Sequence, residues 1–262
     1  MRAATDTERC ARLAQRLDRA ARERTAVRQL SQDGDELTLA EAYGVQGALL
    51  KLREGRGERL IGVKMGFTSE AKRAQMKIND LIFGRLTDAM LIKAGGSLSL
   101  SKFIHPRIEP ELAFLLKAPL AGPVSAAEAC AAVAGVAPAL EVVDSRYRDF
   151  RFSLADVIAD NSSSAALVVG AWQALPQDLR QLPIRMCFDG YPIESGSSDA
   201  IMGDPLLSLM AAARLAGEAG LRLESGWLVM AGGATAAREL RGAARVSVEV
   251  ASLGSAAVEI VP

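Results

Sequence analysis

The chain of 262 residues has one histidine, three cysteines and few aromatic side chains, and its formal charges cancel. A single histidine excludes a zinc centre built from several imidazoles and an HExxH protease. The balance of 31 basic against 31 acidic side chains lacks the basic excess that a nucleic-acid partner requires. Aromatic residues, at 5%, are too few for base-stacking platforms. A metal in this protein must therefore be held by oxygen ligands.

The sequence also lacks a disulfide framework and a membrane span. Cys10, Cys130 and Cys187 are odd in number and form no CxxC pair, which is typical of a reducing cytoplasm. No apolar run approaches the ~18 residues that a membrane span needs. Acidic residues in the arginine-rich N-terminus are unlike a transit peptide. We therefore predict a cytoplasmic protein without membrane or nucleic-acid partners.

The first part of the chain has the pattern of helices. Apolar residues recur at helical spacing over residues 7–30, and Thr38 with Glu41 forms a capping box for a second helix. We predict a helical N-terminal segment over residues 1–60 and a catalytic β-rich domain over residues 61–262, in one continuous globular unit.

The remainder alternates between strand and helix signals. Asp189-Gly190 marks a hairpin, Ser125 with Glu128 forms a second capping box, and Asp204-Pro205 begins a helix that runs to about Gly220. Strands are expected from period-two alternation and from apolar runs, at residues 61–63, 108–117, 135–143, 165–172, 184–188, 245–250 and 257–261. The predicted fold class is α+β or mixed α/β, with helices that flank a β-rich core.

Three glutamates form the main chemical pattern. Side chains alternate along a strand, so Glu109 and Glu111 share one face about 7 Å apart, and Glu141 stands in an apolar strand. Carboxylates in an apolar frame need a cation, and three of them suit an octahedral Mg²⁺ or Mn²⁺ site. Alternatively, the first two lie on the solvent side of an edge strand, and Glu141 pairs with Arg107 or Arg146.

Four further features are compatible with a site. Lys64 follows an apolar strand, where partial desolvation suits a proton donor or an anion clamp, although a surface lysine fits equally. Asp80 is either a site carboxylate or a turn residue. The polar row 159–164 offers small hydrogen-bonding groups, or is a polar loop with capping serines. His105, as the only histidine, is more typical of a supporting role than of proton transfer.

The combination resembles the hydratase/decarboxylase branch of the fumarylacetoacetate hydrolase superfamily. The motifs that carry the resemblance occur in the family's order from about Thr38 to the C-terminus: Lys-Met-Gly-Phe-Thr-Ser at 64–69, His-Pro-Arg-Ile-Glu-Pro-Glu at 105–111, Glu141, and Ala-Asp-Asn-Ser-Ser at 159–163. The resemblance implies a fumarylacetoacetate-hydrolase-like β-rich core with flanking helices.

The resemblance also implies residue roles. Glu109, Glu111 and Glu141 match ligands of Mg²⁺ or Mn²⁺. Lys64 matches the active-site lysine, and Asp80 matches a polar active-site position. The substrate pocket is matched by one of Ser162 or Ser163, with the choice left open, and by Thr235, which lies with Gly233 and Ala234 in the loop that closes the far side of the pocket.

The branch contains two activities. The segment 230–237, Lys64-Met65-Gly66 and His105 resemble the decarboxylase pattern, which implies metal-dependent conversion of 4-oxalocrotonate to 2-hydroxypenta-2,4-dienoate and CO₂ in aromatic meta-cleavage catabolism. The alternatives are hydration of 2-oxopent-4-enoate, or a mainly structural role beside the hydratase. The implied partners are a 2-oxo dicarboxylic acid, the pathway hydratase and further copies of the chain.

Overall fold

The computed structural model describes residues 2–69 and 80–262, with side chains from Thr7 onward. The α-helices of this part are α1 (Arg2–Glu23), α2 (Leu39–Glu54), α4 (Ala126–Ala132), α5 (Leu154–Ala159) and α6 (Pro205–Glu218). The strands are β1 (Leu60–Gly66), β2 (Ile82–Thr87), β3 (Leu91–Lys93), β4 (Ser97–Ser99), β5 (Arg107–Leu116), β6 (Val133–Val143), β7 (Ser164–Val169), β8 (Pro183–Phe188), β9 (Tyr191–Ser197), β10 (Leu228–Met230), β11 (Arg238–Glu239), β12 (Arg245–Val250) and β13 (Gly254–Val261). The predicted mixture of helices around a β-rich core is confirmed.

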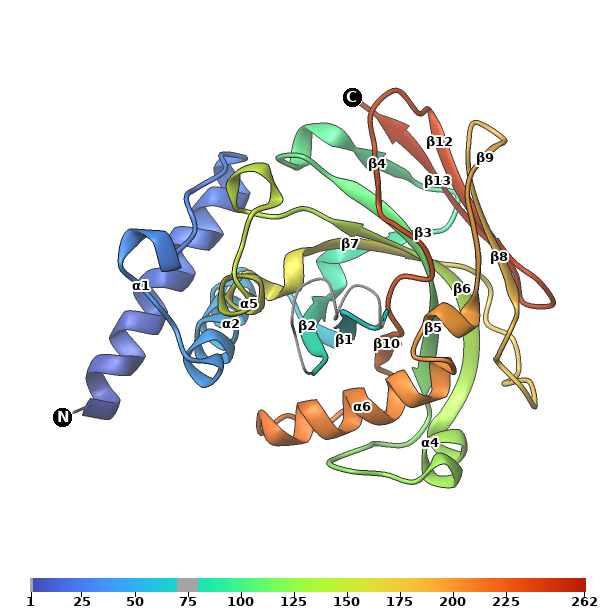
Figure 1. Cartoon of the computed structure of the whole chain (residues 1–262), viewed down its shortest axis with the longest axis horizontal. Coiled ribbons are helices and arrows are strands. Elements are labelled where there is room, and N and C mark those ends of the chain that lie inside the picture. The colour runs from blue at the N-terminus through green and yellow to red at the C-terminus, as the bar shows by residue number, and fades with distance from the viewer. Residues whose placement is uncertain (1, 70–79) are drawn as a thin grey trace.

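Two sheets make up the core of the fold (Figure 1). The larger sheet has the order β2-β1-β10-β5-β6-β7-β3, with β11 paired to the start of β5. Its strands are antiparallel except for the β1–β10 and β3–β7 pairs. The smaller sheet has the order β4-β13-β12-β8-β9. The large sheet is curled (Figure 1). We call the face on the outside of the curl, which other elements cover, the outer face, and the face on the inside of the curl the inner face.

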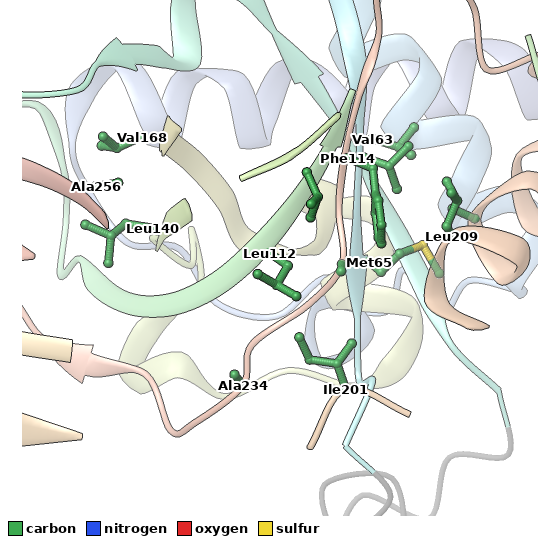
Figure 2. Packing of buried hydrophobic residues seen from close by; sticks show 14 of the residues in the cluster. Val63, Met65, Leu112, Phe114, Leu140, Val168, Ile201, Leu209, Ala234 and Ala256 are labelled. Carbon is green, nitrogen blue, oxygen red and sulfur yellow. The ribbon is translucent and has the colours of Figure 1, made fainter. Parts of the chain in front are cut away.

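The outer face of the large sheet carries the main hydrophobic core. Figure 2 shows Val63, Met65 and Phe114 of β1 and β5 in the same cluster as Leu209 of α6. Leu140 of β6 belongs to this cluster too, together with valines of the smaller sheet. The inner face has a smaller apolar cluster, whose buried members are Leu86, Met90, Ala113, Ala139, Leu167, Leu228 and Met230.

The N-terminal helices pack beside α5 on one flank of the molecule (Figure 1). The capping box at Thr38 is confirmed, because its side chain accepts from the backbone N–H of Glu41 while Glu41 accepts from Thr38. The helix predicted over residues 7–30 is wrong in its last part. It ends at Glu23, where Arg24 has φ 53°, and Val27 then pairs with Tyr147 in an isolated bridge. The division at residue 60 stays a prediction.

Several local predictions are confirmed. Asp189 and Gly190 turn the β8–β9 hairpin with φ values of 50° and 84°, as a primed turn requires. Asp204 caps α6 by accepting from the backbone N–H of Leu206. The capping box at Ser125 begins α4. The strand predicted over 165–172 instead ends at Val169.

No helix in the described part of the chain is long and apolar enough to cross a bilayer. None of the three cysteines forms a disulfide in the described part of the chain, and Cys130 is exposed on α4.

Candidate metal centre and active site

The three glutamates converge on the inner face of the large sheet. Strands β5 and β6 are neighbours, and their register places Glu109 directly opposite Glu141. Glu111 follows two residues later on the same face of β5. One carboxylate oxygen from each of the three lies within 4.8 Å of the other two. The predicted convergence is therefore confirmed, and the pairing of β5 with β6 produces it.

The edge-strand alternative is wrong. Strand β5 is central, since β6 pairs with one side of it and β10 and β11 with the other. Glu111 and Glu141 are fully buried, and Glu109 is 9% exposed. Arg146 does not pair with Glu141, because its guanidinium binds Asp160.

The electrostatics of the cluster favour a cation. Burial raises the pKa of Glu111 well above its ordinary value, and the charges of Glu141 and Glu109 raise it further. Burial also raises the pKa of Glu141, which the Lys64 ammonium partly opposes. The Oε1 atoms of Glu111 and Glu141 are buried without a hydrogen-bond partner among the described residues. Buried acceptors at this spacing fit a hard divalent cation that prefers oxygen ligands.

Lys64 lies inside β1, opposite Met230 of β10 and Gly84 of β2. Its side chain is 5% exposed, and Nζ donates to Glu141 Oε2 at 3.2 Å. The alternative of a surface lysine is therefore wrong. Gly84 gives the lysine room, because a Cβ there would stand 3.3 Å from Lys64 Cε and 2.6 Å from the Asn161 carbonyl oxygen.

Two glycines after β10 contact the carboxylates directly. The backbone N–H of Gly232 donates to Glu111 Oε2 at 2.8 Å. A Cβ at Gly233 would stand 2.4 Å from Glu109 Oε2. The sequence prediction placed Gly233 in a loop that closes the far side of the pocket and assigned Gly232 no role. A Gly-Gly pair directly after a buried strand was the available signal, since glycine permits close backbone approach.

The polar row 159–164 forms a buried turn between α5 and β7. Asn161, Ser162 and Ser163 all have left-handed backbones, with φ values of 52°, 52° and 58°. Residues with side chains adopt this region rarely, so the surrounding contacts must hold the turn. Asn161 exchanges hydrogen bonds with the backbone of Arg85 at 2.7 and 2.9 Å.

The two predicted serines differ in their contacts. Ser162 Oγ donates to the carbonyl oxygen of Phe83 at 2.9 Å, so this hydroxyl ties the turn to β2. Ser163 Oγ is buried and has no hydrogen-bond partner among the described residues. The two hydroxyls therefore differ, because only that of Ser162 is used to hold the turn.

A buried ion pair between Arg146 and Asp160 stabilises this turn. Asp160 accepts from the Arg146 guanidinium and, at 3.0 Å, from the Arg146 backbone N–H. Burial raises the pKa of Asp160 to about 6, although Arg146 acts in the opposite direction. The sequence prediction considered Arg146 only as a partner of Glu141, because nothing in a linear pattern distinguishes one acidic partner from another.

The other predicted residues lie outside the carboxylate cluster. Asp80 is exposed just before β2, and it accepts from the backbone N–H of Leu81 and, at 2.8 Å, from Arg214. Thr235 is half-buried, and its methyl group occupies the space above Gly196. His105 Nε2 lies 2.7 Å from the carbonyl oxygen of Ser145, which suits the supporting role expected of it.

A large cavity lies away from the three clustered glutamates. The cavity of about 720 Å³ between α2, β2, α5 and α6 is lined mainly by apolar side chains and by none of Glu109, Glu111 and Glu141. Its size does not make it the reaction site, because the titratable groups that can hold a metal lie on the other face of the sheet.

Known proteins are similar to most of the chain. The family model for the fumarylacetoacetate (FAA) hydrolase C-terminal domain matches residues 59–261. A 4-oxalocrotonate decarboxylase from a Pseudomonas species is 52% identical over 244 residues, which cover 93% of this chain and 95% of that protein. A 2-hydroxyhexa-2,4-dienoate hydratase from Comamonas testosteroni is 35% identical, with 83% and 84% covered.

A solved structure is also similar to nearly the whole chain. It is 4-oxalocrotonate decarboxylase from Pseudomonas putida G7, complexed with magnesium and adipate. The TM-score is 0.93 at 36% identity, and the match covers 97% of this chain and 98% of that one.

Proposed function

The chain belongs to the fumarylacetoacetate hydrolase family, and we propose that it is a magnesium-dependent 4-oxalocrotonate decarboxylase, a carbon–carbon lyase. The observation that carries the proposal is the convergence of three buried glutamates beside a buried lysine. The decarboxylases among its relatives are more similar to the chain than the hydratase is.

Glu109, Glu111 and Glu141 would hold Mg²⁺, or Mn²⁺ in its place. When bound, the ion supplies Lewis-acid stabilisation of negative charge at the 2-oxo group of the substrate. The protein itself orients the ligands: the Gly232 N–H fixes one oxygen of Glu111, and Lys64 fixes one oxygen of Glu141.

The reaction breaks the bond between C5 and C6 of 2-oxohex-3-enedioate. C6 leaves as CO₂, and the electron pair of the broken bond moves through the conjugated carbons toward the C2 oxygen. One proton added at that oxygen gives 2-hydroxypenta-2,4-dienoate. Lys64 Nζ carries donor hydrogens in a site that excludes bulk water, so we assign it to stabilise the developing oxyanion or to deliver that proton.

Four polar positions complete the proposal. Ser163 offers its unpartnered hydroxyl to the substrate, while Ser162 and Thr235 shape the pocket wall. Asp80 is proposed as a second catalytic group; its carboxylate borders the cavity of about 720 Å³ and pairs with Arg214, so this role requires it to leave Arg214 and move toward the glutamates. If Asp80 is a catalytic group, Asp80→Asn should lower kcat more than tenfold. An unchanged kcat would reduce Asp80 to an ion-pair partner of Arg214.

The hydratase alternative uses the same three glutamates but adds water to a monocarboxylic 2-oxo acid. Incubation of the purified protein with Mg²⁺ and 4-oxalocrotonate, with CO₂ measured, separates the two. We expect metal-dependent CO₂ release that is lost in Glu109→Gln and Glu141→Gln and kept in Glu249→Gln, an exposed glutamate of the smaller sheet. A parallel incubation supplies 2-hydroxypenta-2,4-dienoate as the substrate. Water addition to this compound, together with no CO₂ release from 4-oxalocrotonate, would contradict the decarboxylase proposal.

Finer expectations belong to the same proposal. They are a place in aromatic meta-cleavage catabolism, a cytoplasmic location, a complex with the pathway hydratase and a homo-oligomer. Size-exclusion chromatography with light scattering, with and without the hydratase, tests the two assemblies. If the role is mainly structural, the Lys64→Met variant should still form the complex with the hydratase although it no longer decarboxylates the substrate.

A further inference from the structure

We propose that Arg107 binds the distal carboxylate of the substrate and thereby selects dicarboxylic 2-oxo acids over monocarboxylic ones. The inference rests on the proposed function and adds the group that recognises the far end of the substrate. It follows from where the cations of the inner face lie.

Arg107 begins β5 on the same face as the metal ligands. Side chains alternate along a strand, so residues 107, 109 and 111 share one face, at steps of ~7 Å. Exposure increases along this row, from fully buried Glu111 through Glu109 at 9% to the Arg107 side chain at 38%. The open side of the glutamate cluster therefore faces Arg107. One such step is close to the separation of the two carboxyl carbons in an extended six-carbon diacid.

The inner face offers few other cations. On the inner face of β1, β5, β6 and β10, the register leaves Lys64 and Arg107 as the cationic side chains. Lys64 is already bound to Glu141 at 3.2 Å. Among the described residues, the ion-pair partner of Arg107 is Glu239, whose side chain is 61% exposed and whose Oε1 lies 4.0 Å from Arg107 Nη2. A solvated contact of this length is easily exchanged for a substrate carboxylate.

The guanidinium of Arg107 is also held in place. Its central carbon lies 4.3 Å from the centre of the Phe150 ring, and the His105 ring packs on Phe150 at 4.6 Å. His105 is fixed in turn by the carbonyl oxygen of Ser145. A stacked guanidinium keeps its donor edges free for a bidentate contact with a carboxylate.

The chemistry sets the kinetic role of this contact. The distal carboxylate is the one released as CO₂, so its negative charge disappears as the C5–C6 bond breaks. A contact with that charge is strongest in the bound substrate and weaker in the transition state. Arg107 therefore contributes to binding and selectivity, and its loss raises KM without lowering kcat.

A matched pair of inhibitors tests the proposal. 2-Oxohexanedioate and 2-oxohexanoate share the chelating end and differ in the distal carboxylate. We expect the wild type to bind the diacid about 10- to 100-fold more tightly, as a charge-assisted bidentate contact implies. Arg107→Met, which keeps an apolar stem over Phe150, should bring the two inhibition constants within about threefold, and Arg107→Lys should fall between.

Controls separate the possible failures. Arg238→Met removes a half-exposed arginine from neighbouring β11, opposite Ile108 and so one step off the row of ligands, and should keep the wild-type preference. Unchanged affinity for 2-oxohexanoate in Arg107→Met shows that the fold and the metal site persist. An unchanged preference in Arg107→Met, or a fall in kcat at saturating substrate, would overturn the assignment. Absence of CO₂ release in the wild type would instead refute the proposed function.

Discussion

Gly233 gives a direct test of how the backbone shapes the metal centre. Alanine at this position would place its Cβ 2.4 Å from Oε2 and 2.7 Å from Cδ of Glu109. Both distances are below any normal non-bonded contact, so the carboxylate must move by on the order of 1 Å, enough to spoil a site that depends on geometry. The contacted atoms are the end of a side chain and not backbone, so the fold can accommodate the methyl group.

The expected magnitude follows from the proposed role of Glu109 as one of three metal ligands. Displacing a ligand or its support typically costs 10- to 100-fold in metal affinity, or ~1.4–2.7 kcal/mol. We therefore expect Gly233→Ala to weaken Mn²⁺ and Mg²⁺ binding by this factor. The free energy of unfolding of the metal-free protein should change by less than about 1 kcal/mol.

The assay is calorimetric titration of chelator-treated protein with Mn²⁺, beside urea unfolding of the same sample. Gly44→Ala is the matched control, since its Cβ would meet only the Cys10 sulfur, 3.2 Å away and on the N-terminal helices. Wild-type metal affinity in Gly233→Ala would refute the reasoning, because it would mean that Glu109 is not a ligand or that the loop yields instead. If Gly233→Ala prevents the metal-free protein from folding, the substitution acts on the fold of the loop and not on the metal site.

The remaining predictions concern residues around the cluster. Lys64→Met should reduce the rate of CO₂ release by on the order of 100-fold or more, measured at saturating substrate and metal. Ser163→Ala should raise KM with little change in the unfolding midpoint, since its hydroxyl has no partner in the described structure. Ser162→Ala should instead lower the free energy of unfolding by about 0.5–1.5 kcal/mol, because the Phe83 carbonyl oxygen loses one of its side-chain donors and keeps Gln46 Nε2. Burial raises the pKa of Asp160 from 3.8 to about 6, so between these values the folded protein holds a proton that the unfolded chain has lost, and stability falls as pH rises. Asp160→Asn should remove this slope, read from urea midpoints at pH 4, 5 and 6; an unchanged slope would place the pKa of Asp160 elsewhere.

The sequence predicted the carboxylate cluster in part, because each of the three proposed metal ligands occurs in a strongly patterned strand. Alternation fixed that Glu109 and Glu111 share a face, and the apolar context of Glu141 predicted a buried charge. Alternation within one strand does not reveal how that strand is aligned with its neighbour. Only the pairing of β5 with β6 brings Glu141 opposite Glu109 and excludes an edge position.

The supporting residues were harder to predict, for a different reason. Strand β10 has three residues, too few for a periodic signal, yet it places Gly232 against Glu111. The left-handed turn at Asn161 is held by two hydrogen bonds exchanged with the backbone of Arg85, which lies 76 positions away in the sequence. The helix predicted through residue 30 failed because apolar residues after Glu23 pack at helical spacing without a helix.

The opposition of Glu109 and Glu141 has a consequence for how the gene can change. A strand has a side-chain period of two, so inserting or deleting one codon within β6 before Glu141 would turn its carboxylate from the inner face into the packed outer one. The same change would carry Leu140 toward the cluster. Single-codon length changes in β5 and β6 should therefore be absent from any functional library of this protein, whereas the β8–β9 hairpin turn at Asp189 should tolerate them.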